Sequence, residues 1–219
     1  MKTCLPLALI VLMAAAATVR AAPTFDGRDL REAVFTRCDL SGATFEDCVL
    51  GGALLDDCTG SELKITAGEL AKLNLRDTKL PALNWYNVEL RDGRFERGAL
   101  KDCTMSYVTL EGLKLDRCEA RRQVWEYCDL REVYFSRVEM RDARFENVNA
   151  GSSRFDYTDF SWGRMNNCEF DGARFERGSL RGATFFGADF SNVRLDGCSI
   201  RGMTINGVDI EDLLRKAGR

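Results

Sequence analysis

Large apolar residues recur at every fifth position along most of this chain. The frame from Phe25 to Ile210 has 38 positions, and 35 of them carry Phe, Leu, Ile, Met or Trp. The three exceptions are Gly60, Ala120 and Ala150. A helix face needs a spacing near 3.6 and a half-buried strand needs a spacing of 2, so a period of five fits neither element. The pattern predicts a solenoid, in which each short unit turns a corner and buries its apolar residue against stacked neighbours.

The repeating unit has a small residue, a polar residue, a large apolar residue and then two small or polar residues. Examples are C-D-L-S-G, A-T-F-E-D, C-D-L-R-E, A-R-F-E-N, A-T-F-F-G and A-D-F-S-N. These units resemble the pentapeptide-repeat family, whose consensus is A-(D/N)-L-x-x with Leu or Phe at the centre. The resemblance implies an all-β solenoid: a right-handed, four-sided β-helix of about nine coils, with four units in each coil. Residues twenty apart would then stack about 4.8 Å from each other, as neighbouring strands do. Such a fold does not by itself fix a function.

The first 21 residues are predicted to be a secretory signal peptide. Lys2 precedes an apolar run from Leu5 to Ala17, and Val19 and Ala21 occupy positions −3 and −1 of a cleavage site. The apolar run is too short to span a membrane. We therefore expect a periplasmic or secreted protein that begins near residue 22.

One solenoid domain, residues 22–208, and a C-terminal helical cap, residues 209–219, make up the rest of the chain. Ile210, Leu213 and Leu214 form an apolar stripe between leading acids and trailing bases, as a short helix prefers. We expect this helix to cover the last coil. The N-terminal coil has no visible cap, so this open edge is a candidate for pairing with a second copy of the chain.

Composition argues against several classes of function. Cleavage would remove two bases and leave 34 acidic against 29 basic side chains, which makes broad attraction to nucleic acid or to a membrane surface unfavourable. The sequence contains no His, no C-x-x-C and no glycine-rich phosphate loop before a helix. We expect no enzyme, no cofactor, no metal and no small-molecule substrate.

Eight cysteines follow the signal peptide, and all lie two residues before a frame position. They are Cys38, Cys48, Cys58, Cys103, Cys118, Cys128, Cys168 and Cys198. That slot should face the narrow lumen, where Cys serves as a small apolar filler. Only Cys38 and Cys58 are twenty apart, and their parallel side chains disfavour a disulfide bond without deciding their oxidation state.

The repeat is weakest between residues 59 and 83. Leu63, Leu73 and Leu83 overfill the small slot, and Pro81 lacks the N–H that a strand ladder uses. We expect distorted or widened coils in this stretch.

Two groups of outward residues are candidates for binding a protein. A basic column contains Arg94, Lys114, Arg154, Arg174 and Arg194, and an acidic column lies beside it. It can be read as a solvated network of ion pairs, each worth little, or as an arginine-rich face for an acidic partner. The aromatic candidates are Tyr107 and Tyr127, stacked outside the coil, and Trp162 on another outward slot. Exposed aromatic side chains are better interface candidates than charges.

The favoured hypothesis is an exported, non-catalytic binding protein with a protein partner, specifically an immunity protein that neutralises a secreted toxin effector. An alternative follows from the resemblance, because some pentapeptide-repeat proteins mimic duplex DNA and bind DNA gyrase. The predicted export and the basic column argue against that alternative. A third hypothesis is an inert envelope scaffold. The sequence alone leaves the partner, the binding face and the oligomeric state open.

Overall fold

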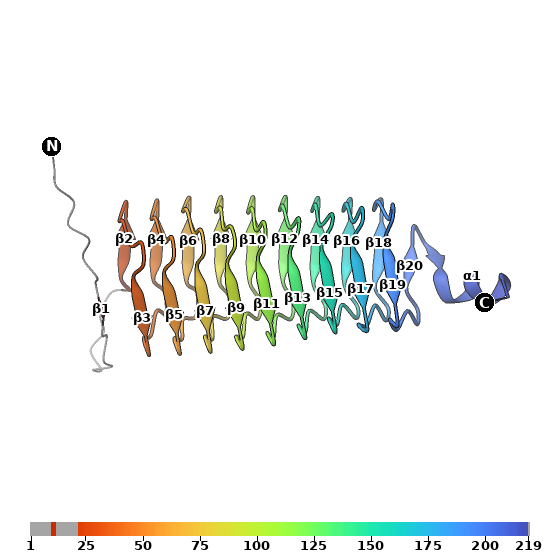
Figure 1. Ribbon diagram of the computed structural model, residues 1–219, viewed down its shortest axis with the longest axis horizontal. Coiled ribbons are helices and arrows are strands. Elements are labelled where there is room, and N and C mark those ends of the chain that lie inside the picture. Colours follow the sequence, from red (N-terminus) through yellow and green to blue (C-terminus); the bar gives the residue numbers. More distant parts are fainter. Residues whose placement is uncertain (1–9, 12–21, 219) are drawn as a thin grey trace.

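The computed structural model describes residues 10–11 and 22–218 and is a rod of stacked coils (Figure 1). Each coil takes twenty residues. Two of its four sides are short parallel strands, with registers such as Thr104↔Val124, and the other two sides are single-residue bridges such as Glu69↔Glu89. The predicted four-sided β-solenoid of about nine coils is confirmed.

The strands form two sheets, and each sheet runs the length of the rod. The odd sheet consists of β1 (Ile10–Val11), β3 (Val34–Thr36), β5 (Leu54–Asp56), β7 (Asn74–Arg76), β9 (Arg94–Glu96), β11 (Lys114–Asp116), β13 (Tyr134–Ser136), β15 (Arg154–Asp156), β17 (Arg174–Glu176) and β19 (Arg194–Asp196). The even sheet consists of β2 (Thr24–Asp26), β4 (Thr44–Glu46), β6 (Lys64–Thr66), β8 (Asn84–Tyr86), β10 (Thr104–Ser106), β12 (Val124–Glu126), β14 (Arg144–Glu146), β16 (Arg164–Asn166), β18 (Thr184–Phe186), β20 (Thr204–Ile205) and β21 (Val208–Asp209). β1 lies within the predicted signal peptide and pairs with β3, whereas the rest of residues 1–21 lie outside the described residues.

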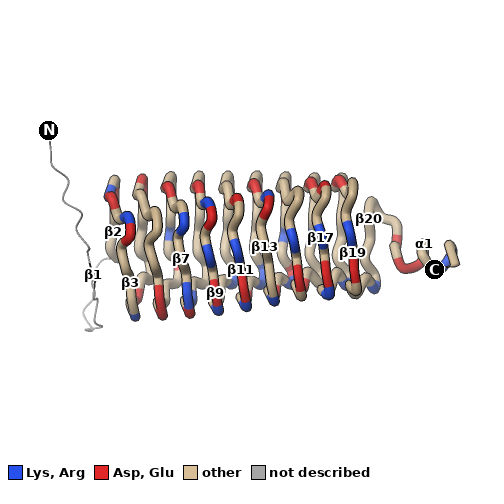
Figure 2. The backbone as a smooth tube through the Cα atoms, in the orientation of Figure 1, with Lys and Arg blue, Asp and Glu red and all other residues tan. Residues whose placement is uncertain are grey.

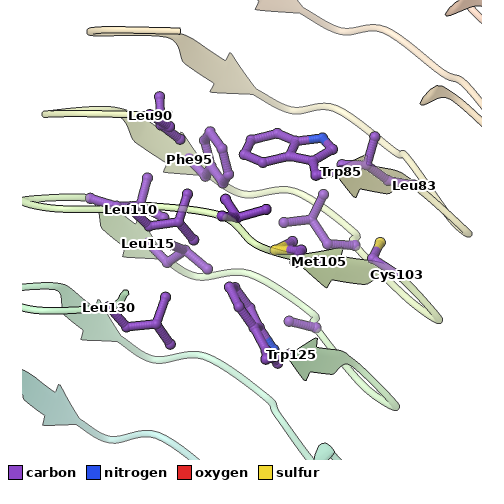
Figure 3. Close-up of a cluster of buried hydrophobic side chains, with 14 of the residues drawn as sticks. Leu83, Trp85, Leu90, Phe95, Cys103, Met105, Leu110, Leu115, Trp125 and Leu130 are labelled. Carbon is purple, nitrogen blue, oxygen red and sulfur yellow. The ribbon is translucent and has the colours of Figure 1, made fainter. Parts of the chain in front are cut away.

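The core is a single column of apolar side chains inside the coils. The middle residue of each three-residue strand points inward, and Trp85 and Trp125 are almost fully buried. Figure 3 shows these two indoles on either side of Met105, each from a different coil. Aromatic rings also stack between coils, as Phe155 and Phe175 do at 4.7 Å between ring centroids. The five-residue period therefore places one large side chain per unit in a shared lumen.

The corners of the coil require left-handed backbone. Most residues whose numbers end in 2 or 7 have φ near +50° to +70°, for example +54° at Asn87 and +68° at Gly42. Glycine and asparagine adopt this region with least strain, whereas large side chains disfavour it. A large side chain at a corner is therefore unfavourable for stability and indicates another role for that residue.

The coils between residues 59 and 83 are regular, so the expectation of distortion there was wrong. Leu63, Leu73 and Leu83 are fully buried in the small slot. Leu63 and Leu73 fit because the neighbouring frame positions hold Gly60 or the aliphatic residues Ile65, Leu70 and Leu75 where other coils hold Phe, so the volume in that part of the lumen is kept. Leu83 is buried beside the indole of Trp85. Pro81 is tolerated because the equivalent N–H groups bond a side chain rather than the ladder, as the N–H of Ser41 does with Asp39.

The predicted C-terminal helix is confirmed as α1 (Ile210–Lys216), with Asp209 as its N-cap. Its placement differs from the expectation, because it extends beyond the rod and does not cover the last coil (Figure 1). Ile210 packs against the core, but Leu213 and Leu214 remain exposed. The reason is local: β20 and β21 pair antiparallel and turn the chain away before the helix begins.

The eight cysteines line the lumen as predicted, seven of them buried and Cys198 half-buried. Within the described residues no disulfide bond joins any of them. Burial raises the pKa of Cys103 to about 12 and that of Cys118 to about 11. These thiols stay protonated near neutral pH and lack the thiolate that nucleophilic chemistry needs.

Candidate protein-binding surfaces

Three exposed tyrosines form a ladder along one corner of the even sheet. Tyr107 and Tyr127 stack with ring centroids 5.1 Å apart and nearly parallel planes, and Tyr86 meets Tyr107 edge to face at 5.7 Å. Each side chain is about half exposed. The tyrosine ladder of Tyr86, Tyr107 and Tyr127 therefore presents contiguous aromatic surface that contributes little to the core.

Backbone geometry makes this arrangement unfavourable for stability alone. Tyr107 and Tyr127 occupy corner positions with φ of +57° and +54°. The corners before and after them in the same column carry Asn87 and Asn147, which suit left-handed backbone better. A bulky ring at a strained and exposed position is a reasonable indication of a functional role.

The surface around the tyrosine ladder is acidic. Three columns of residues, each with members twenty apart, meet at this corner: those of Tyr86, of Tyr107 and of Glu69. Among the described residues, none of these columns contains Lys or Arg. A shallow groove of about 290 Å³ beside Tyr107 is lined by Glu69, Asn87, Glu89 and Thr109, among others. Aromatic rings next to carboxylates suit a partner that presents Arg or Lys side chains.

The predicted basic column lies on the odd sheet in the expected register. Figure 2 shows basic and acidic bands alternating along β9, β11, β17 and β19. Three of its members pair with neighbouring carboxylates: Arg94 with Glu96 at 3.2 Å, Arg154 with Glu176 at 3.0 Å and Arg194 with Asp196 at 3.3 Å. For these members the structure favours an ion-pair network, which leaves less uncompensated charge for a partner.

One slot of this column holds an aromatic residue in place of a base, as the sequence register predicts. Tyr134 takes a basic slot, and the guanidinium of Arg154 lies over its ring at 5.6 Å. A shallow groove of about 530 Å³ runs beside it and is lined by Lys114, Glu132, Val133, Tyr134, Ser152 and Arg154. Lys114 and Arg174 have no carboxylate within ion-pair distance among the described residues. A binding role for the basic column stays a prediction.

The corner beside the odd sheet carries further arginines that are held by acids. Arg97 bonds both carboxylate oxygens of Asp77, and these hydrogen bonds lower the pKa of Asp77. Arg177 bonds Asp156, whose side chain is only 11% exposed, and stacks on Tyr157 at 4.6 Å. These contacts stabilise the coil.

The predicted site residues do not gather in one place. Tyr107 and Tyr127 are together, the basic column is on the other sheet, and Trp162 occupies a third position at the opposite edge of the even sheet. Tyr86 was missed because it occupies a different slot of the repeat from Tyr107. A search for outward aromatic residues at either end of a strand would have found it.

The described residues show neither a metal centre nor a membrane helix. No group of three or more His, Cys, Asp or Glu side chains in residues 22–218 is placed to hold an ion. In the same part of the chain, no helix has the length and apolar character needed to cross a membrane.

The stacked five-residue units define a β-solenoid whose outward surfaces are open and shallow. A sequence model of the pentapeptide repeats matches residues 24–59, 128–167 and 164–202, in eight copies that together cover 111 of the 219 residues. The chain belongs to the pentapeptide-repeat family.

Solved structures agree with this fold. A trypsin-treated variant of QnrB1, described as a plasmid-mediated fluoroquinolone resistance protein, is 18% identical, with a TM-score of 0.66 over 90% of this chain and 97% of that chain. HetL, a pentapeptide repeat protein involved in heterocyst differentiation regulation from the cyanobacterium Nostoc sp. strain PCC 7120, is 17% identical, with a TM-score of 0.54 over 85% of this chain and 92% of that chain. No curated protein matches the sequence.

Proposed function

We propose that this chain is an exported, non-catalytic protein-binding solenoid that acts in the periplasm as an immunity protein against a secreted toxin effector. The observation that carries the protein-binding role is the tyrosine ladder. Its three rings are exposed and contact one another, and Tyr107 and Tyr127 lie on left-handed backbone, whereas the large apolar residues of the repeat frame are buried or packed on the core. Aromatic clusters of this kind dominate the binding energy of many protein interfaces.

The predicted signal peptide supports the compartment, because an apolar run with a cleavage site directs a chain out of the cytoplasm. The surface supports a binder more than an enzyme, since the grooves beside Tyr107 and Tyr134 are shallow and open. The step from an exported binder to toxin immunity rests on compartment and fold.

A second candidate is a DNA mimic that binds gyrase. The acidic surface at the tyrosine ladder favours it, because a row of carboxylates can imitate a phosphate backbone, but Arg91 and Arg131 neutralise Glu89 and Asp129 in that row. The basic column and predicted export argue against this role here. The third candidate, an inert envelope scaffold, predicts no partner at all.

The decisive experiment begins with cell fractionation and intact mass. A periplasmic species that starts near Ala22 supports export, and a cytoplasmic species that retains Met1 contradicts it. A strain that lacks the protein should then be killed in co-culture by its parent, and the wild-type gene should restore survival. Equal survival of the deletion strain would contradict immunity, and potent inhibition of gyrase supercoiling by the purified protein would favour the second candidate.

Variants identify the binding face. Tyr107→Ala combined with Tyr127→Ala should fail to restore survival and should weaken the complex with the toxin by at least about tenfold, or about 1.4 kcal/mol. Tyr157→Ala is the matched control, because Tyr157 has the same exposure and the same left-handed backbone on another corner. Arg154→Glu with Arg174→Glu tests the basic column. Unchanged affinity in both double variants would exclude both faces.

A further inference from the structure

One side of the coil is the column of single-residue bridges that contains Glu119, Glu139 and Asp159. Basic residues beside this column form ion pairs with it in the earlier coils but not in the last ones. In the earlier coils each base bonds the acid eighteen residues later: Lys101 with Glu119 at 2.9 Å, Arg121 with Glu139 at 2.7 Å and Arg141 with Asp159 at 2.6 Å. The acid column continues as Ser179 and Ser199. The same spacing therefore gives Arg181 a serine where the earlier bases have a carboxylate.

Arg201 and Arg164 show the same loss. For Arg201 the same spacing leads to position 219, which is an arginine in the sequence and not an acid. Arg164 lies on β16 in register with Arg144 on β14, and Arg144 bonds Glu146. The slot equivalent to Glu146 is Asn166, so the strand of Arg164 offers an amide where that of Arg144 offers a carboxylate. Among the described residues, Arg164, Arg181 and Arg201 are exposed and have no ion pair.

Trp162 lies at the corner of the coil between the column of Arg181 and Arg201 and the column of Arg164. Its backbone N–H donates to the carbonyl of Arg181 at 2.9 Å, and the N–H of Gly182 donates to the carbonyl of Arg201 at 2.9 Å. The indole is 58% exposed and lies across Gly182, where a Cβ atom would overlap the ring. Trp162 and Gly182 both have left-handed backbone, with φ of +63° and +64°. The ring is seated on the corner of the next coil and away from the core.

Trp162, Arg164, Arg181 and Arg201 are named the arginine–tryptophan patch. The chemistry of this patch favours an acidic partner. Arginine binds carboxylates through paired N–H groups, and an uncompensated arginine gains more from a new partner than one already bonded. The patch covers about 10 Å along the rod, or two coil steps. Duplex nucleic acid needs a longer basic track than this patch offers. Asp142 and Asp159 lie in the coils before the patch and would repel phosphates that extended past it. A short acidic peptide segment therefore fits the charges better.

We propose that the arginine–tryptophan patch binds an acidic segment of a protein partner, with carboxylates on Arg164, Arg181 and Arg201 and an apolar side chain against Trp162. This inference rests on the proposed protein-binding role, places a second binding surface apart from the tyrosine ladder, and does not depend on export or on toxin immunity.

Tryptophan fluorescence tests the proposal directly. The chain has three Trp residues, and Trp85 and Trp125 are buried, so acrylamide quenching reports Trp162 selectively. Titration of the full chain with a hexaglutamate peptide should protect Trp162 from acrylamide saturably, and added salt should weaken the protection. A hexalysine peptide of equal length should give no protection. Absence of saturable protection by hexaglutamate would overturn the proposal and leave the survival assay unaffected.

Charge-matched variants separate a site from general electrostatics. Arg181→Glu with Arg201→Glu should lower the affinity for hexaglutamate at least about tenfold. Arg28→Glu with Arg37→Glu changes the net charge equally at exposed arginines roughly 35 Å away along the rod, and should change the affinity less than about twofold. An equal loss in both variants contradicts a local site. Circular dichroism confirms folding, and Arg181→Gln with Arg201→Gln should give an intermediate loss.

The class of ligand is tested with the same signal. At equal concentration of negative charge, hexaglutamate should bind more tightly than oligodeoxythymidine and more tightly than phosphatidylglycerol vesicles. Tighter binding of either alternative would replace the acidic peptide by a nucleic acid or a membrane surface and overturn the assignment.

Discussion

Small polar side chains in the lumen bond the main chain of the preceding coil. The hydroxyl of Thr78 donates to the carbonyl of Leu55 at 3.2 Å, and the hydroxyl of Ser153 donates to that of Leu130 at 2.7 Å. The thiol of Cys58 makes the equivalent contact with Phe35 at 3.3 Å. Cys, Thr and Ser are therefore more than fillers in this slot, because their donors reach carbonyl oxygens twenty-three residues earlier. The sequence indicated a small residue here and gave no sign of the hydrogen bond.

The same slot contains a glycine whose position leaves no room for a side chain. A Cβ atom on Gly178 would overlap the carbonyl oxygen of Thr158. We expect Gly178→Ala to lower the free energy of unfolding by about 1–3 kcal/mol, because the two coils must separate to admit the methyl group. Urea denaturation measures the change. Gly51→Ala is the control, since its Cβ would meet only atoms at 3.6 Å or more, and it should change stability by less than about 0.5 kcal/mol. Equal effects would show that glycine removal, rather than the close approach, is responsible.

The ion pairs at the corners of the coil differ in the exposed fraction of their acidic side chain. Arg97 and Arg177 occupy the same corner column with the same φ of +53°, but the side chain of Asp77 is 43% exposed and that of Asp156 is 11% exposed. The two pairs therefore differ in the burial of the acid, and Arg177 also stacks on Tyr157 at 4.6 Å.

We expect Arg177→Ala to destabilise the chain by about 1–3 kcal/mol, because it leaves a largely buried carboxylate of Asp156 without its partner. Arg97→Ala should cost less than about 1 kcal/mol, since water can solvate Asp77. Thermal unfolding of the two variants measures the difference. A larger loss for Arg97→Ala would show that burial of the acid does not decide the strength of these pairs.

Much of the fold was predictable from the sequence, because one five-residue period determines which side chains face inward. The period also placed the basic column and the pair Tyr107 and Tyr127 correctly. It could not predict regular coils at Leu63 and Leu73, since packing depends on volumes summed over neighbouring coils. Nor could it predict the direction of α1, which depends on one antiparallel pairing between β20 and β21.

Burial decreases toward the C-terminal end of the whole rod. Phe185 is fully buried, whereas Phe190, Leu195 and Ile200 are only partly buried. Each coil contacts only its neighbours, and α1 leaves the last coil open, so this end should open most often. Amide hydrogen exchange should be slowest in β10–β16 and faster in β19 and β20. Uniform protection along the rod would indicate that it opens as one cooperative unit.

The twenty-residue coil also governs how the two aromatic surfaces can change during evolution. An insertion of five residues between Tyr127 and Trp162 would keep the frame residues inside, yet it would turn everything after it by a quarter of a revolution. The arginine–tryptophan patch would then leave the edge of the even sheet, the sheet whose other edge carries the tyrosine ladder. Duplication of a complete coil would instead preserve the facing and add about 4.8 Å between the two surfaces. Length changes in multiples of twenty would therefore adjust the reach of a binding face, whereas changes of five would redirect it.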